Sequence, residues 1–151
     1  MSPAKHSTPS LWAQGLGYGG LIPFVGLALA VWLWPMYQAK AASALLGYSA
    51  TIASFLGAIY WGLTMRDPQG QSTSLLAWGV VPSLLAWLAL MLPADKGMLL
   101  IAALLWACFA VDRVVYTRCG LRAWLPMRLL LTVVASLSCV AGAIALTRST
   151  P

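Results

Sequence analysis

The amino-acid sequence predicts an all-α polytopic membrane protein, built as a bundle of five transmembrane helices. Hydrophobic residues make up 61% of the 151 residues and charged residues only 8%, and the mean hydropathy is +0.84. A soluble domain carries about 25% charged residues, so this chain lacks the polar surface that water requires. Its apolar residues form five blocks close to the ~20 residues that a membrane-spanning helix needs, without the period-two alternation of a membrane barrel.

The expected helices cover residues 16–34, 44–65, 75–92, 97–115 and 125–146. They form one transmembrane domain (15–147) between an amino-terminal tail (1–14) and a short carboxyl-terminal tail (148–151). Backbone polar groups in lipid must be paired internally, and helices satisfy this within one segment. The fourth helix has the shortest uninterrupted apolar stretch, which ends at Asp112 and Arg113, three and two residues before the predicted end of the helix. The first block is too long for the apolar region of a cleaved signal peptide.

The connections between these helices differ in charge. The side that holds the amino terminus carries six basic residues: Lys5, Arg66, Arg113, Arg118, Arg122 and Arg128. The other side carries three: Lys40, Lys96 and Arg148. Because cytoplasmic loops are enriched in Lys and Arg, the sequence predicts a cytoplasmic amino terminus and a carboxyl terminus on the outer side.

Several function classes are disfavoured by residue counts. The chain has three acids, no Glu, and one imidazole, His6, which precedes the first apolar block. Metal and haem sites in membranes rely on imidazole ligands, so we expect no metal and no cofactor. Paired carboxylates for acid–base catalysis are also missing, so we expect no catalytic residues. The net charge of +6 is spread over the loops and does not indicate nucleic-acid binding.

A ridge of small residues follows one face of the second helix. Its members stand four residues apart: Ala50, Ser54, Ala58 and Gly62. Small side chains let helices approach closely in lipid. The spacing is consistent with packing inside the bundle or against another membrane subunit or a second copy, and it leaves both open.

Helices one and three each contain a proline inside an apolar run, Pro23 and Pro82. A proline removes one helical hydrogen bond and frees a carbonyl about one turn earlier, here at Gly19 and Trp78. Freed carbonyls in lipid must find a new partner. Trp87 and Trp106 fall deep in their helices, where indole N–H groups need partners too. Core packing explains these residues, and so does a pocket for a lipophilic small molecule near the two prolines.

Asp112 and Arg113 form a charge pair within a predicted helix. A helix-end anchor is favoured by their depth: Arg113 reaches toward the head groups, and Asp112 pairs with it or with an arginine of the basic, interfacial loop 117–128. A substrate or proton contact at Asp112 is the alternative. Tyr60 and Trp61 are expected near the inner interface, where amphipathic rings gather.

Four stretches together resemble one family of proteins. They are GLIPF at Gly20–Phe24, SFLGAIYWGL at Ser54–Leu63, VPSLLAWLAL at Val81–Leu90, and the helix end at Asp112 and Arg113. They resemble the family called domain of unknown function 3429, which includes transmembrane protein 69 relatives. The family is bacterial and mitochondrial, and the resemblance implies a small multi-span inner-membrane protein without supplying a reaction or catalytic residues. We expect this protein in the bacterial inner membrane.

We therefore expect a non-enzymatic protein that packs with, or helps assemble, another membrane complex. The alternative is a binder or carrier of a lipophilic small molecule. The expected partners are the lipid bilayer, another membrane subunit or a second copy, and a lipophilic small molecule, but not nucleic acid.

Overall fold

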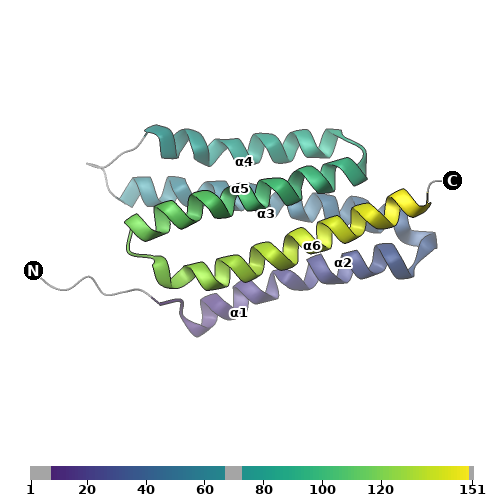
Figure 1. Cartoon of the computed structure of the whole chain (residues 1–151), viewed down its shortest axis with the longest axis horizontal. Coiled ribbons are helices and arrows are strands. Elements are labelled where there is room, and N and C mark those ends of the chain that lie inside the picture. The colour runs from purple at the N-terminus through teal and green to yellow at the C-terminus, as the bar shows by residue number, and fades with distance from the viewer. Residues whose placement is uncertain (1–7, 67–72, 150–151) are drawn as a thin grey trace, which may run out of the picture.

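The computed structural model describes residues 8–66 and 73–149, and within those ranges the chain folds into helices without strands (Figure 1). The helices are α1 (Leu11–Gly19), α2 (Leu21–Leu33), η1 (Pro35–Tyr37), α3 (Gln38–Arg66), α4 (Thr73–Met91), α5 (Ala94–Arg118), η2 (Arg122–Trp124) and α6 (Leu125–Ser149). Five segments are long and apolar enough to cross a membrane, the first of them made of α1 and α2 together. The predicted fold class is confirmed. Lys5 and His6 lie outside the described residues.

Several helices, the first and the fourth among them, extend further than the sequence predicts. The first begins at Leu11, where the Ser10 hydroxyl caps it by accepting a hydrogen bond from the Ala13 N–H at 3.2 Å. The fourth, α5, continues past Asp112 and Arg113 to Arg118. The predicted end is residue 115, so the helix is three residues longer at this end than predicted. Asp112 lies well inside it and is buried in the bundle with hydrogen-bond partners.

The first span is broken between α1 and α2 at Gly20, three residues before Pro23. The Tyr48 hydroxyl of α3 donates a 2.8 Å hydrogen bond to the Gly20 carbonyl. A neighbouring helix therefore supplies the hydrogen-bond donor for a backbone carbonyl at this break. The carbonyl is that of Gly20, one residue after Gly19, whose carbonyl was predicted to lack a helical partner. In contrast, α4 runs unbroken through Pro82.

The helix α3 lies at the centre of the bundle and contacts α2, α4, α5 and α6. Figure 1 shows α4 along one edge, α1 and α2 along the opposite edge, and α6 beside α2. The start of α1 and the end of α6 lie at opposite ends of the bundle, as an odd number of crossings requires.

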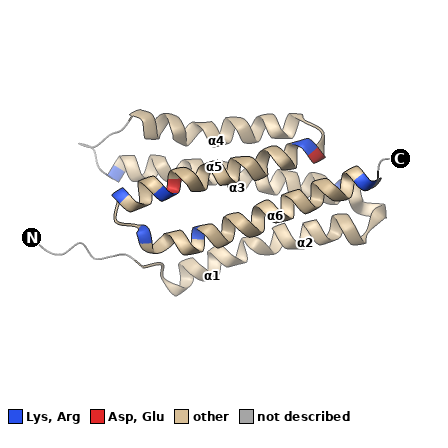
Figure 2. Ribbon diagram, viewed as in Figure 1, with Lys and Arg blue, Asp and Glu red and all other residues tan. Residues whose placement is uncertain are grey.

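Basic residues gather at the end of the bundle where α5 turns into α6 (Figure 2). We call this the arginine-rich end, after Arg66, Arg118 and Arg122, and the other the opposite end. This asymmetry is the one from which the orientation is predicted.

Small residues set the distance between α3 and α4. A Cβ atom on Gly57 would meet the Gly79 carbonyl of α4, and Pro82 packs beside the same glycine. Of the predicted ridge, Ala50 is buried and Ser54 half-buried, whereas Ala58 and Gly62 are exposed. The ridge therefore serves packing inside the bundle along its first half and faces outward along its second.

Candidate functional site

Three polar side chains from three helices meet inside the bundle: Tyr60 of α3, Asp112 of α5 and Arg128 of α6. The Tyr60 hydroxyl donates to Asp112 Oδ1, while Arg128 donates to Asp112 Oδ2 from Nε at 2.8 Å and from Nη2. Their exposed fractions are 0%, 2% and 8%. We call this group the polar triad. Its one negative and one positive charge cancel, and charge-assisted hydrogen bonds satisfy both carboxylate oxygens.

The turn between α5 and α6 brings the two charges to one depth. Gly120 adopts a φ of +72°, which only glycine takes readily. Asp112 and Arg128 stand eight residues to either side of Gly120, so two antiparallel helices carry them to the same level. At 1.5 Å per residue, Arg128 lies about 5 Å along α6 from its first residue, inside the span.

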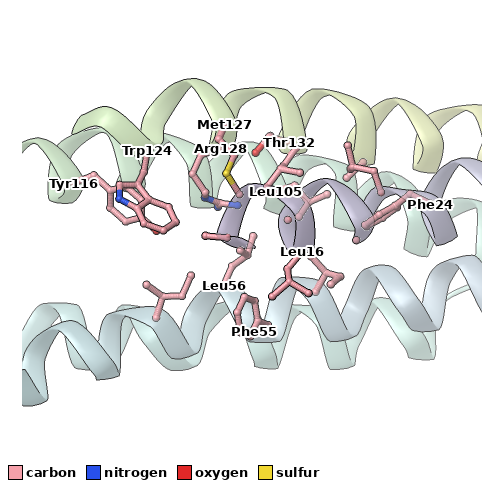
Figure 3. A pocket seen from close by; sticks show the side chains of 18 residues that line it. Leu16, Phe24, Phe55, Leu56, Leu105, Tyr116, Trp124, Met127, Arg128 and Thr132 are labelled. Atoms are coloured by element: carbon pink, nitrogen blue, oxygen red, sulfur yellow. The ribbon is translucent and has the colours of Figure 1, made fainter. Parts of the chain in front are cut away.

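A largely apolar cavity of about 370 Å³ adjoins the polar triad and extends from Trp124, near the arginine-rich end, toward the middle of the bundle at Phe24 and Ala135. Its walls come from α1, α2, α3, α5, η2 and α6 (Figure 3). The lining side chains labelled in Figure 3 include Leu16, Phe24, Phe55, Leu56 and Leu105. Ligand pockets in proteins measure about 300–1,000 Å³ and are mostly apolar with few polar groups, which describes this cavity.

The polar groups of the cavity lie on its α5–α6 side: Arg128, Tyr116 and Thr132. The Tyr116 hydroxyl lies close enough to the Arg128 side chain to interact with it electrostatically. The Thr132 side chain is 2% exposed, and its hydroxyl finds no hydrogen-bond partner among the described residues. A buried hydroxyl without a partner costs about 1–3 kcal/mol. Arg128 therefore belongs to both the polar triad and the cavity wall.

One side of the cavity opens toward the outside of the bundle. Within the described part of the chain, α1 contacts α2 and α6 but not α3. Leu16 of α1 and Phe55 of α3 line the cavity, yet they are 76% and 63% exposed. The opening thus lies between α1 and α3. Both helices belong to candidate membrane spans.

The structure brings Tyr60 and Asp112 together but leaves Arg113 exposed outside the cluster. Asp112 does pair with an arginine of the loop 117–128, namely Arg128. The interpretation of Asp112 as a helix-end anchor is nevertheless wrong, because its side chain is buried inside the bundle and is also bonded to Tyr60. Tyr60 is a core residue and not an interfacial ring. Trp61 packs against Gly79 of α4, where its Nε1 would lie 2.8 Å from an added Cβ.

The pocket predicted near Pro23, Pro82, Trp87 and Trp106 is not the cavity found, since none of the four lines it. Pro82 is buried at the contact between α3 and α4, and Trp106 stacks edge-on against Phe109 at 6.0 Å. Trp87 lines a second, shallower groove between α3 and α4. The position of a residue along an apolar segment predicts its depth in the membrane. It does not predict whether the side chain points into the bundle or away from it.

Sequence reasoning assigned Arg128 to an interfacial loop and gave Tyr116 and Thr132 no part in a pocket. A usable signal was the equal distance of Asp112 and Arg128 from Gly120, which predicts an ion pair in an antiparallel hairpin. No three His, Cys, Asp or Glu side chains cluster within residues 8–66 and 73–149. The groups at this site are suited to hydrogen bonding and apolar contact.

Comparison with known proteins gives a family and a partial relative. A family described as "Protein of unknown function (DUF3429)" matches residues 10–144, as the resemblance predicted. Transmembrane protein 69 from Xenopus tropicalis is 41% identical over 78 residues, which cover 50% of this chain and 31% of the relative. The chain therefore spans about a third of the length of that relative. No solved structure matches.

Proposed function

Because this chain belongs to the DUF3429 family, whose function is unknown, we propose its function from the geometry of the site. The protein binds an amphipathic small molecule, drawn from the surrounding membrane, in the cavity between α1, α3 and α6. The molecule enters between Leu16 and Phe55, leaves its apolar part against the helices, and holds its polar part at Arg128.

The observation that carries this proposal is an apolar cavity that opens between two candidate membrane spans and has a buried charged side chain, Arg128, in its wall. Helices in lipid associate by close packing, because lipid tails are as apolar as their side chains. At a cavity of about 370 Å³, the helices that surround it lose these packing contacts. A ligand restores these contacts and gives the polar groups in its wall a partner.

Binding without chemical conversion fits the polar triad. A general acid or base needs a titratable group that can reach the substrate. Both oxygens of Asp112 are already occupied by Tyr60 and Arg128. We therefore propose that the protein is not an enzyme, and that the polar triad holds three helices together and orients the Arg128 guanidinium.

The proposed location is the bacterial inner membrane, with the arginine-rich end in the cytoplasm. Thr132 lies about 10 Å along α6 from its first residue at 1.5 Å per residue, about a third of the way through a hydrocarbon core of about 30 Å. The cavity then opens into the cytoplasmic leaflet.

A tryptophan placed in the opening tests the proposal. Ala13 of α1 lines the cavity, and Ala103 of α5 is exposed away from it. Ala13→Trp fills the opening, whereas Ala103→Trp adds the same ring on another exposed face. The three proteins are purified in mild detergent, and co-purified amphiphiles are measured by native mass spectrometry. We expect wild type and Ala103→Trp to retain a bound species and Ala13→Trp to lose at least about 90% of it, a tenfold change worth about 1.4 kcal/mol. Equal retention by all three proteins, or no bound species in wild type, contradicts the proposal.

A second candidate function is docking of another transmembrane helix in the groove between α3 and α4. Small residues line much of this groove, including Gly47, Ala50, Ser54 and Ser83. Such residues favour close helix contacts in lipid, and a partner subunit or a second copy would supply the helix.

Leucine substitutions at two open glycines test this second candidate. An added Cβ at Gly47 or at Gly26 would meet no atom within 4 Å, but only Gly47 lines the groove. Gly47→Leu is expected to reduce cross-linking of the chain to a membrane partner several-fold, while Gly26→Leu leaves it unchanged. A single uncross-linked species in all three proteins contradicts docking.

A further inference from the structure

We propose that the head group held in the cavity is a neutral carbonyl group on a flat ring, the chemistry of an alkyl-substituted quinone or aromatic ketone. This inference rests on the proposed function, and it specifies what the cavity selects. Charge balance, hydrogen-bond donors, ring contacts and size each support it.

Charge balance argues against an ionic head group. The positive charge of Arg128 is neutralised by Asp112 at hydrogen-bond distance, and both side chains are buried. A carboxylate or phosphate beside them would leave one uncompensated negative charge in a low-dielectric site, which is strongly unfavourable. An ammonium group would meet the same penalty with the opposite sign. A neutral head group avoids both.

The donors available at the cavity call for an acceptor. A guanidinium carries five N–H donors. Its two hydrogen bonds to Asp112 and one contact with Tyr116 leave at least two of them. Thr132, one turn further along α6, supplies a hydroxyl without a partner among the described residues. A carbonyl oxygen has two lone pairs and no proton of its own, so it can accept from Arg128 and Thr132 together.

An alcohol head group fits less well. Its oxygen can accept from Arg128, but its proton then needs an acceptor of its own. Both Asp112 oxygens already accept hydrogen bonds from Tyr60 and Arg128. The alcohol would compete with these bonds or rely on Thr132 alone.

Aromatic side chains and cavity size favour a flat ring with a long tail. Phe24, Phe55, Tyr116 and Trp124 all line the cavity, and Figure 3 shows Tyr116 and Trp124 on the same side of Arg128. Aromatic side chains stack on flat rings. The volume of about 370 Å³ lies near the lower limit for ligand pockets. It therefore accommodates a head group and the first part of a chain, and the rest extends into lipid past Leu16 and Phe55.

Matched probes with one tail and different heads test this selectivity. Decylbenzoquinone, methyl decanoate, decanol and decanoate are titrated calorimetrically into the full chain in lipid nanodiscs, with probe-free nanodiscs subtracted. We expect the quinone to bind most tightly, then the ester, and decanol and decanoate about tenfold more weakly than the quinone, since one hydrogen bond contributes about 0.5–1.5 kcal/mol. Tightest binding of decanoate would overturn the proposal and indicate an anionic head group. Tightest binding of decanol would overturn it in favour of an alcohol.

Two threonine variants assign the preference to the cavity. Thr132→Val keeps the side-chain shape and removes the hydroxyl, while Thr147→Val makes the same change near the other end of α6, where Thr147 bonds the Ile144 carbonyl. We expect Thr132→Val to weaken quinone binding about five- to tenfold, in line with the loss of one hydrogen bond, and Thr147→Val to leave it unchanged. If Ala13→Trp abolishes binding of every probe but Thr132→Val changes nothing, the cavity binds amphiphiles and the head-group inference fails. If Ala13→Trp leaves all binding intact, the proposed function itself fails.

Discussion

The two halves of the bundle are held together by different means. Toward the opposite end, helices touch through small residues: a Cβ atom on Gly97 would lie 2.5 Å from the Ala89 carbonyl, and one on Gly142 would lie 2.8 Å from Leu45. Val31, Leu45 and Met98 are fully buried in this half. Backbones approach as closely as they can, and the space between them is filled.

In the arginine-rich half, small residues still bring α3 and α4 together at Gly57 and Gly79, but the polar triad holds α3 to α5 and α6, and the packing beside the triad is less complete. Hydrogen bonds from Tyr60 and Arg128 to Asp112 tie α3, α5 and α6 together. The helix α1 contacts α2 and α6 but leaves α3. Where α1 does approach α6, at Gly17, its neighbour is the flexible end of Met127. The cavity lies in this half.

This difference explains where a site can exist in so apolar a chain. Lipid provides no hydrophobic force between helices, so close packing or polar bonds must hold them. Close packing leaves no room for a ligand. Polar bonds at one point can hold helices while the space beside that point stays open. The polar triad thus has a structural role that also makes the cavity possible.

The largest effect is expected from breaking the polar triad. Arg128→Met leaves Asp112 as an uncompensated buried charge and should lower the free energy of unfolding by about 3–5 kcal/mol. The double variant Asp112→Leu with Arg128→Met removes both charges and should recover most of this loss. Unfolding by titration with sodium dodecyl sulfate in mixed micelles measures both.

The matched control is Arg113→Met, which removes the exposed arginine next to Asp112. It should change the free energy of unfolding by less than about 0.5 kcal/mol. A loss of similar size in Arg113→Met and Arg128→Met would mean that the polar triad does not hold the arginine-rich half.

The sequence is sufficient to predict the five helices, but not to predict which face of each helix points into the bundle. Segment length and hydropathy predicted five spans, because lipid imposes both constraints directly on the chain. For Trp87 and Trp106 the sequence predicts a deep position, in the core or in a pocket, yet Trp87 lines the outer groove and Trp106 is exposed. Two residues at equal depth can face opposite ways, and a uniformly apolar helix carries no amphipathic signal that distinguishes them.

Polar residues were better guides than aromatic ones. Asp112 and Tyr60 were both singled out from the sequence, and they are bonded to each other. Arg128 was assigned to a loop because it stands near the start of the last apolar block. A charge inside a span requires a partner of opposite charge. Asp112, the only buried acid of the described residues, therefore indicates that a basic residue such as Arg128 lies beside it.

A smaller effect contrasts the packing of the two halves directly. In Gly97→Ala, the new methyl group meets the Ala89 backbone oxygen at 2.5 Å, so the turn between α4 and α5 must shift. We expect a loss of about 1–3 kcal/mol, as for other overpacked positions. In Gly17→Ala, the methyl group meets the mobile end of Met127, which can turn into the adjoining cavity. Alanine also favours a helix over glycine by about 1 kcal/mol, so Gly17→Ala should be neutral or stabilising in the same titration. Equal losses for the two variants would mean that the arginine-rich half is packed as tightly as the opposite one, which would leave no basis for a ligand cavity there.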